Sequence, residues 1–170
     1  MSFSLLIVRN PFKESPHYGK WLAVNECDNL GWWIPGGAVD AGETFAHAAQ
    51  RECFEEAGMR VVLKGILKVD HSVKGMENCR MRVIYYAEPE NVQEAHRFKT
   101  RADRESLEAR WVTLKELDKL SHERPGLRGP ELVEWGEYLE KGGAIYPMAM
   151  FGDEGRVPAS EMSSSYKIRT

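Results

Sequence analysis

One segment with helical periodicity lies among several short strand-like segments of this chain. Apolar residues recur at helical spacing from Thr44 to Ala57, and Gly58 follows where a left-handed helix cap is expected. Short apolar runs typical of strands lie around it, at residues 3–9, 20–25, 31–35, 59–69, 81–87 and 110–112. Such a helix buries its apolar face against a sheet, so the pattern predicts an α/β (α+β) sandwich.

The 170 residues are enough for one domain with a core of its own. We place this domain at residues 1–151. Its last elements are expected to be a short helix near Leu114–Leu120 and an amphipathic helix over Pro130–Glu140. Residues 152–170 are rich in serine and glycine and lack apolar periodicity, which predicts a flexible C-terminal tail.

Composition excludes several classes of function. The net charge of −3 argues against binding to a nucleic acid polymer or a membrane surface, since such proteins usually carry a basic face. The chain contains no apolar run of roughly 20 residues, the length that spans a bilayer. The three cysteines, Cys27, Cys53 and Cys79, have no metal-site spacing, which favours reduced thiols and a cytoplasmic location. A small-molecule partner is expected.

Three glutamates on the central helix form the most informative cluster. Glu52, Glu55 and Glu56 fall within an arc of roughly 100° at the C-terminal end of the helix, where neither like charges nor the helix dipole favour them. Arg51 can pair with Glu55, but one guanidinium does not neutralise three acids. A solvated acidic face is the plain alternative; a bound divalent cation, which prefers carboxylate oxygens, is the functional one. Beside the acids lies a stripe of small residues that would allow close packing on a sheet: Ala46, Ala49, Cys53 and Ala57.

The whole segment Gly37–Met59 resembles the complete Nudix box, G-x5-E-x7-R-E-U-x-E-E-x-G-U, in which U is a bulky apolar residue. Cys53, smaller than usual, and Met59 occupy the two U positions. A Trp-rich strand that runs into Pro35-Gly36-Gly37 precedes the box, and the strand around Trp111 resembles a later strand of the family. All the fixed positions match: Gly37, Glu43, Arg51, Glu52, Glu55, Glu56 and Gly58.

The resemblance implies a fold, a cofactor and a reaction. The fold is the Nudix α/β/α sandwich with a mixed β-sheet. The reaction is attack of water on a phosphorus atom of a diphosphate in a nucleotide-like small molecule. The cofactor is Mg²⁺, for which Mn²⁺ can substitute. The implied metal ligands are Gly37 (through its carbonyl), Glu52, Glu55 and Glu56, and the implied catalytic residues are Arg51, Glu52, Glu55 and Glu56, with Glu43 bracing the loop.

Several points stay open at this level. The general base is either Glu52 or one of three acids before the Trp111 strand, namely Asp103, Glu105 and Glu108. A non-catalytic Nudix-fold regulatory module and a Nudix-fold isomerase acting on an isoprenoid diphosphate are alternatives, although the complete box favours a hydrolase. Many members of the family are dimers, so a homodimer is also allowed.

Substrate contacts need an aromatic shelf and cations. We select Trp33 and Tyr85 as shelves and Arg9 and Arg82 as phosphate contacts. The other candidates are Trp32, Phe45, Lys68 and Arg80. Residues 74–77, Lys-Gly-Met-Glu, contain neither the proline nor the tyrosine that marks two Nudix subgroups. A nucleoside triphosphate, a nucleotide sugar and other nucleoside diphosphate derivatives all remain candidate substrates.

Overall fold

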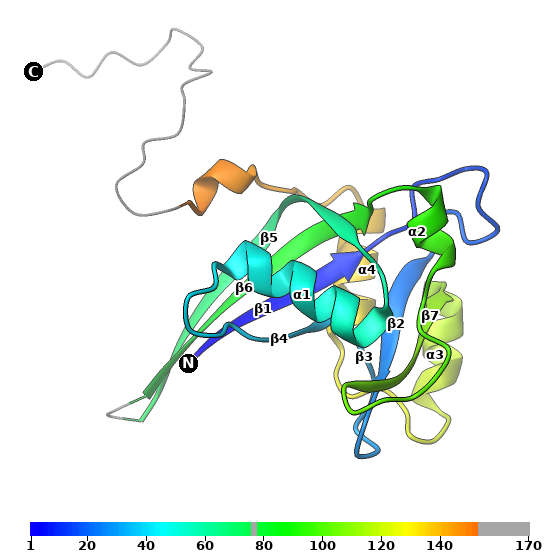
Figure 1. Cartoon of the computed structure of the whole chain (residues 1–170), viewed down its shortest axis with the longest axis horizontal. Coiled ribbons are helices and arrows are strands. Elements are labelled where there is room, and N and C mark those ends of the chain that lie inside the picture. Colours follow the sequence, from blue (N-terminus) through cyan, green and yellow to red (C-terminus); the bar gives the residue numbers. More distant parts are fainter. Residues whose placement is uncertain (76–77, 153–170) are drawn as a thin grey trace, which may run out of the picture.

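The computed structural model describes residues 1–75 and 78–152, so the tail expected at 152–170 lies outside the described residues except for Gly152. The elements follow one another as shown in Figure 1. In chain order they are β1 (Ser2–Val8), β2 (Trp21–Glu26), β3 (Gly31–Trp33), β4 (Gly36–Ala38), α1 (Phe45–Ala57), β5 (Val61–Lys74), β6 (Asn78–Pro89), α2 (Val92–His96), β7 (Ser106–Val112), α3 (Leu114–Ser121), α4 (Glu131–Glu140) and the 3-10 helix η1 (Met148–Met150).

The strands form two sheets. The larger has the order β4-β1-β6-β5, in which β1 runs parallel to β6 while the β1–β4 and β5–β6 pairs are antiparallel. The smaller has the order β3-β2-β7 and is antiparallel. The mixed sheet predicted from the sequence is therefore confirmed.

Helices cover the larger sheet on both sides, with α1 in front of it and α4 behind it in Figure 1. Alternate residues of β1 point to these two layers. Leu6 and Val8 pack with Ala49 and Cys53 of α1, whereas Leu5 and Ile7 belong to a second core. That second core also contains Leu117 of α3 and Leu132 of α4. The arrangement confirms the α/β/α sandwich and the close packing of Ala49, Cys53 and Ala57 on the sheet, whereas Ala46 is half-buried and lies outside this core.

The predicted strand ends were wrong in the β5–β6 hairpin. Both strands extend well beyond the expected ranges 59–69 and 81–87. Asp70 lies opposite Arg82 and Ser72 opposite Arg80, so polar cross-strand pairs continue the hairpin where apolar alternation has ended. Strand β4 and helix α2 were also not predicted, because each is short and its apolar residues do not recur at a regular spacing.

Two glycines shape the ends of the segments that carry the candidate site. Gly58 adopts φ 70° and its amide donates to the Phe54 carbonyl, which ends α1 as predicted. Gly36 adopts φ 150°, and a Cβ there would lie 2.4 Å from the Ser4 carbonyl oxygen. Only glycine fits this position, where the chain passes from β3 in one sheet to β4 in the other within three residues.

Within the described residues, no helix has the length and apolar character needed to cross a membrane.

Candidate active site

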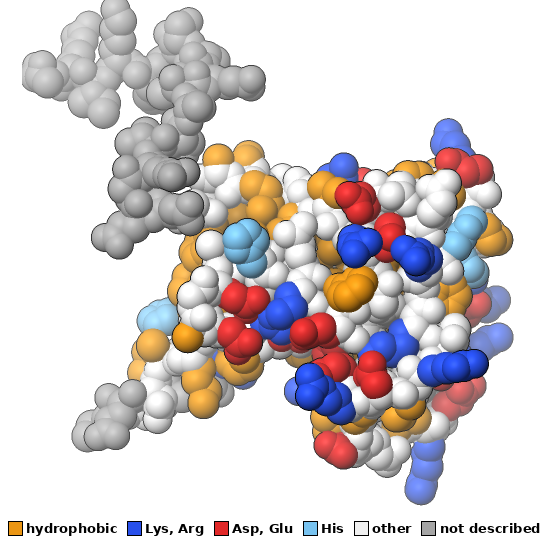
Figure 2. Space-filling model, in the orientation of Figure 1, with side chains coloured by type: hydrophobic (Ala, Val, Ile, Leu, Met, Phe, Trp, Pro, Cys, Tyr) orange, Lys and Arg blue, Asp and Glu red, His pale blue; other side chains and the backbone are white. Residues whose placement is uncertain are grey.

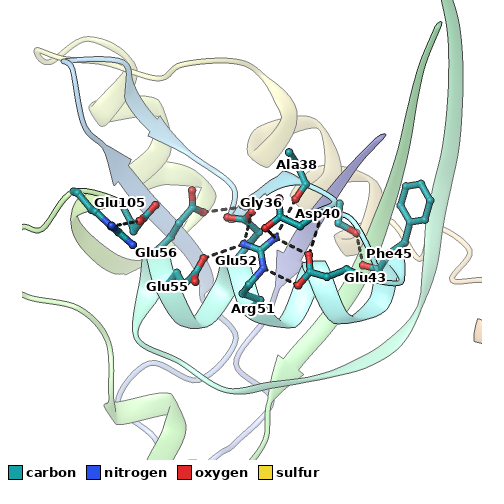
Figure 3. Close-up of polar contacts among 12 residues, drawn as sticks. Gly36, Ala38, Asp40, Glu43, Phe45, Arg51, Glu52, Glu55, Glu56 and Glu105 are labelled. Atoms are coloured by element: carbon teal, nitrogen blue, oxygen red, sulfur yellow. Dashed lines mark hydrogen bonds and ion pairs between the residues drawn. The ribbon is translucent and has the colours of Figure 1, made fainter. Parts of the chain in front are cut away.

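The glutamates of the Nudix-like segment lie along one side of α1, beside the loop that leads into the helix. Thr44 begins α1 as its N-cap, with its hydroxyl accepting a hydrogen bond from the His47 amide. Figure 2 shows acidic side chains gathered around a basic one over this helix. Figure 3 shows the contacts that hold them.

Arg51 connects most of this cluster. Its Nε donates to Glu43 at 2.8 Å, and its Nη1 donates to Glu52 and Glu55 at 2.8 and 2.9 Å. Its Nη2 reaches the Ala38 carbonyl of β4 at 3.0 Å. The guanidinium beside Glu43 lowers the pKa of that carboxyl to about 2. One cation thus fastens the helix to the preceding loop while balancing part of the acidic charge.

Glu56 is the acid that Arg51 does not reach. It is 8% exposed, and its carboxylate accepts one hydrogen bond, from the Gly36 amide at 2.9 Å. Burial raises the pKa of Glu56 to about 8, and the neighbouring charges of Glu52 and Glu26 act in the same direction. An ionised Glu56 is therefore a buried anion without a full counter-charge.

Glu52 lies against the backbone of β4. A Cβ on Gly37 would come within 2.4 and 2.9 Å of the two Glu52 carboxylate oxygens, so the absence of a side chain at residue 37 makes room for this carboxylate. Burial also raises the pKa of Glu52, despite its bond to Arg51.

The donor set suits a hard divalent cation in kind, since carboxylate and carbonyl oxygens are the ligands that Mg²⁺ prefers. In the part of the chain that the structure describes, however, no three acidic, histidine or cysteine side chains converge as a ready metal-binding group. The contacts above explain this: Arg51 holds Glu52 and Glu55, while Gly36 holds Glu56. Cation binding requires these carboxylates to turn toward a common point.

Gly37→Ala tests the space beside Glu52. The added methyl group would displace the Glu52 carboxylate rather than the backbone, so we expect little change in stability. If Glu52 is a ligand of the Mg²⁺ that the family resemblance implies, the apparent dissociation constant for this ion should rise about 10-fold, the loss of roughly 1.4 kcal/mol of binding free energy. Titration of metal-dependent turnover measures this constant. Gly152→Ala is the control, because Gly152 has open space around it and its φ lies outside the left-handed region. An unchanged constant would contradict the role given to Gly37.

The four substrate residues selected from the sequence lie in three places. Arg82 of β6 pairs with Asp70 at 2.9 Å, and the Trp33 indole donates to Glu131 at 2.8 Å. Arg9 follows the far end of β1, stacked over Trp21. That end is opposite the one where Ser4 pairs with Gly37 in β4.

Tyr85, the fourth of them, is buried in the core between α1 and the sheet. The structure therefore brings together Arg82 and Trp33, through Glu131, and it places Arg9 and Tyr85 elsewhere.

Arg82 also lines a cavity of about 470 Å³ between the sheet and α4, which we call the α4 pocket. Its Nε is buried without a hydrogen-bond partner among the described residues. The polar and aromatic residues of the pocket include Asp70, Arg82, Glu131, Trp135, Tyr138 and Tyr146.

The three acids before the Trp111 strand differ in their surroundings. Asp103 caps a turn by accepting from the amides of Glu105 and Ser106, and its bond to Lys99 lowers its pKa to about 2. Glu108 is bound by Arg110 at 3.0 Å. Glu105 lies toward the glutamates of α1 in Figure 3, and its charge contributes to the raised pKa of Glu52.

Two residues near the cluster carried no signal in the sequence. Glu26 ends β2 and is 6% exposed, and Arg128 comes from the loop between α3 and α4. The Arg128 guanidinium donates to both carboxylate oxygens of Glu26. The partners are 102 positions apart, so only the folded chain reveals the pair.

Comparisons with known proteins agree with this geometry. The model of the NUDIX domain family matches residues 3–135. The putative 8-oxo-dGTP diphosphatase YtkD of Bacillus subtilis is 35% identical over 100 residues, which cover 54% of this chain and 62% of the relative, so the match spans less than two thirds of that protein. Phosphatase NudJ of Shigella boydii is 29% identical over 137 residues, covering 79% of this chain and 84% of the relative.

Among solved structures, a NUDIX hydrolase from Nitrosomonas europaea superimposes with a TM-score of 0.66 at 17% identity, covering 89% of this chain and 95% of that one. At this identity the likeness concerns the fold.

Proposed function

This chain belongs to the NUDIX family, and we propose that it is a Mg²⁺-dependent pyrophosphohydrolase. Its substrate is a nucleotide-like small molecule that contains a phosphoanhydride bond. Nucleoside triphosphates, nucleotide sugars and other nucleoside diphosphate derivatives form this class. Mn²⁺ is expected to replace Mg²⁺.

The observation that carries the proposal is the burial of the Glu56 carboxyl beside three further glutamates. Arg51 balances Glu43, Glu52 and Glu55 only in part, and Glu56 is buried beside them with one amide as its partner. A solvated acidic face would not bury a carboxylate in this way. Glu52, Glu55, Glu56 and the Gly37 carbonyl would hold the cation. A bound Mg²⁺ neutralises charge that develops on phosphoryl oxygens and lowers the pKa of bound water.

Residues of the chain position the glutamates and remove the proton from the attacking water. Arg51 keeps Glu52 and Glu55 side by side on α1 and ties them to β4. For removal of the proton from the attacking water, Glu105 is the favoured acid outside the box. Asp103 accepts from the amides of its own turn and Glu108 pairs with Arg110. Among the described residues, by contrast, the Glu105 carboxylate accepts a hydrogen bond only from Arg104, its neighbour in the sequence. Glu52 is the alternative base within the box.

The α4 pocket suits the part of the substrate beyond the diphosphate. In the sheet, Arg82 of β6 lies in register with Phe3 of β1, which lies in register with Ala38 of β4. Two strand spacings, about 10 Å in all, separate the backbone of Arg82 from that of Ala38, whose carbonyl accepts a hydrogen bond from Arg51. Trp135 and Tyr138 offer aromatic surface, while Asp70 and Glu131 offer carboxylate oxygens that can accept hydrogen bonds from a heterocycle.

A phosphate-release screen tests the proposal. The purified chain is incubated with nucleoside triphosphates, nucleotide sugars and other nucleoside diphosphate conjugates, with Mg²⁺ and with EDTA. We expect turnover of at least one compound in Mg²⁺ and none in EDTA. Silence over the whole set, together with tight ligand binding measured by calorimetry, would favour the regulatory module instead.

A further inference from the structure

The α4 pocket and the glutamates lie on different sides of the larger sheet. The glutamates belong to α1, whose buried residues pack with Leu6 and Val8 of β1. The pocket contains Ile84 and Trp135, which belong to the second core together with Leu5 and Ile7. Arg51 and Glu52 contact β4, which is an edge strand of this sheet and follows directly after β3. A ligand that reaches both places would therefore pass this edge.

Arg128 lies at this edge, because its loop is paired with β3. The Trp32 amide donates to the Gly126 carbonyl at 2.8 Å, and the Arg128 amide donates to the Trp32 carbonyl at 3.0 Å. Trp32 and Leu127 form a parallel bridge. The approach is close: a Cβ on Gly31 would lie 2.6 Å from the Gly126 carbonyl oxygen. The backbone that presents Arg128 is thus fixed by the sheet.

The side chain of Arg128 is also held in place. Its guanidinium carbon lies 4.3 Å from the centre of the Trp33 ring, and its Nη1 is bound by the buried Glu26. Trp33 is three residues before Gly36, whose amide binds Glu56, and its indole is bound by Glu131 of the α4 pocket. Arg128 therefore stands between the two halves of the candidate site.

Part of the guanidinium remains available. The side chain is 41% exposed, and within the described residues Nε and Nη2 have no hydrogen-bond partner. A stacked, ion-paired arginine with two open donors has the planar, preorganised geometry that suits a phosphate group.

We propose that Arg128 binds a phosphate group of the substrate at the edge of the sheet, between the glutamates of α1 and the α4 pocket. The inference rests on the proposed function and names the residue that bridges its two parts. Glu26 and Trp33 are positioning residues, since they act by fixing the guanidinium. The ligand chemistry is that of a diphosphate ester whose remaining group enters the α4 pocket.

The first test is Arg128→Gln in the full chain, assayed with the compound identified by the screen. Loss of charged hydrogen bonds to a phosphate should raise KM about 10- to 100-fold while kcat changes less than about 3-fold. Arg128→Lys should recover part of the loss. The matched control is Arg110→Gln, because Arg110 is likewise stacked on a tryptophan, Trp32, and paired with a glutamate, Glu108. It lines a separate cavity beside α3, so its KM should stay at the parental value.

A double variant separates binding from stability. Arg128→Gln leaves Glu26 buried without its counter-charge and should lower Tm, whereas Glu26→Gln with Arg128→Gln removes that penalty and should restore Tm. KM should stay raised in the double variant, and calorimetry with inorganic pyrophosphate in Mg²⁺ should show the same weakening.

Three results would overturn the inference: an unchanged KM in Arg128→Gln, a parental KM in the double variant, or an equal rise in Arg110→Gln. Each leaves Mg²⁺-dependent turnover by the parent intact, so a failure of this inference is distinguishable from a failure of the proposed function.

Discussion

Glu56→Gln should lower Mg²⁺-dependent kcat by about 1000-fold, the scale of removing a group that stabilises transition-state charge. The amide has the shape of the carboxylate and its oxygen can still accept from the Gly36 amide, so the fold should survive. What is lost is the charge that a cation needs. Turnover with the substrate found in the screen measures the effect. A variant as fast as the parent would remove Glu56 from the metal site.

The same variant should be more stable than the parent in alkaline buffer with EDTA. The pKa of Glu56 is raised from 4.5 to about 8 in the folded chain, so ionisation penalises the fold. That penalty is absent below about pH 4.5, grows as the pH rises above that value and is nearly complete above about pH 8. At pH 8.5 it amounts to about 5 kcal/mol, or roughly 10 to 20 °C in Tm for a chain of this size.

Thermal unfolding from pH 5 to 8.5 checks this expectation. The Tm of the parent should fall relative to that of Glu56→Gln as the pH rises, and Mg²⁺ should restore the parent but not the variant. Glu137→Gln on α4, an exposed glutamate paired with Lys141, is the control and should follow the parent. If the Tm of the parent and the Tm of Glu56→Gln changed equally with pH, ionisation of Glu56 would carry no cost in stability.

Arg51→Met is expected to cause the largest loss of stability. The substitution leaves Glu43, Glu52 and Glu55 without their common cation, and the Ala38 carbonyl loses its donor. The Arg51 side chain is 26% exposed, which limits solvent screening. We expect a loss of about 3 kcal/mol, or roughly 6 to 12 °C in Tm, together with about a 100-fold loss in kcat/KM.

The effect of Mg²⁺ on this variant distinguishes charge from packing. If repulsion among the glutamates causes the loss, then Mg²⁺ should raise the Tm of Arg51→Met more than that of the parent. Arg51→Lys keeps the charge but not the planar fork, so it should recover Tm in part and activity less. A Tm equal to that of the parent, or one that Mg²⁺ does not raise, would contradict the role of Arg51 as the shared counter-ion.

The central helix and the sandwich could be predicted because their signals are local. Apolar spacing marks α1, Gly58 ends it, and the small residues Ala49 and Cys53 face the sheet as expected. The fixed spacing of the glutamates also predicts that Glu52 and Glu55 lie side by side. These features depend on residues within a few turns of one another.

The rest of the candidate site depends on contacts between distant segments. Glu26 and Arg128 are 102 positions apart, and Trp33 meets Glu131 across 98. Neither pair has a periodic or spacing signal. The roles of Asp103 and Glu105 also stayed open, since only the folded loop shows that Asp103 closes a turn while Glu105 faces α1. The sequence also did not predict the ends of β5 and β6. There the cross-strand pair of Asp70 and Arg82 continues the hairpin, and this pair is visible only in the folded chain.

The short connection from β3 to β4 at Gly36 determines how the candidate site responds to heating. The Gly36 amide, which donates to Glu56, lies at the start of β4, directly after the short connection from β3. These two strands belong to different sheets. Because this connection is only two residues long, it has little freedom to unfold locally while the two sheets stay folded. The acidic centre should accordingly persist, correctly shaped, up to the temperature at which the sandwich itself comes apart.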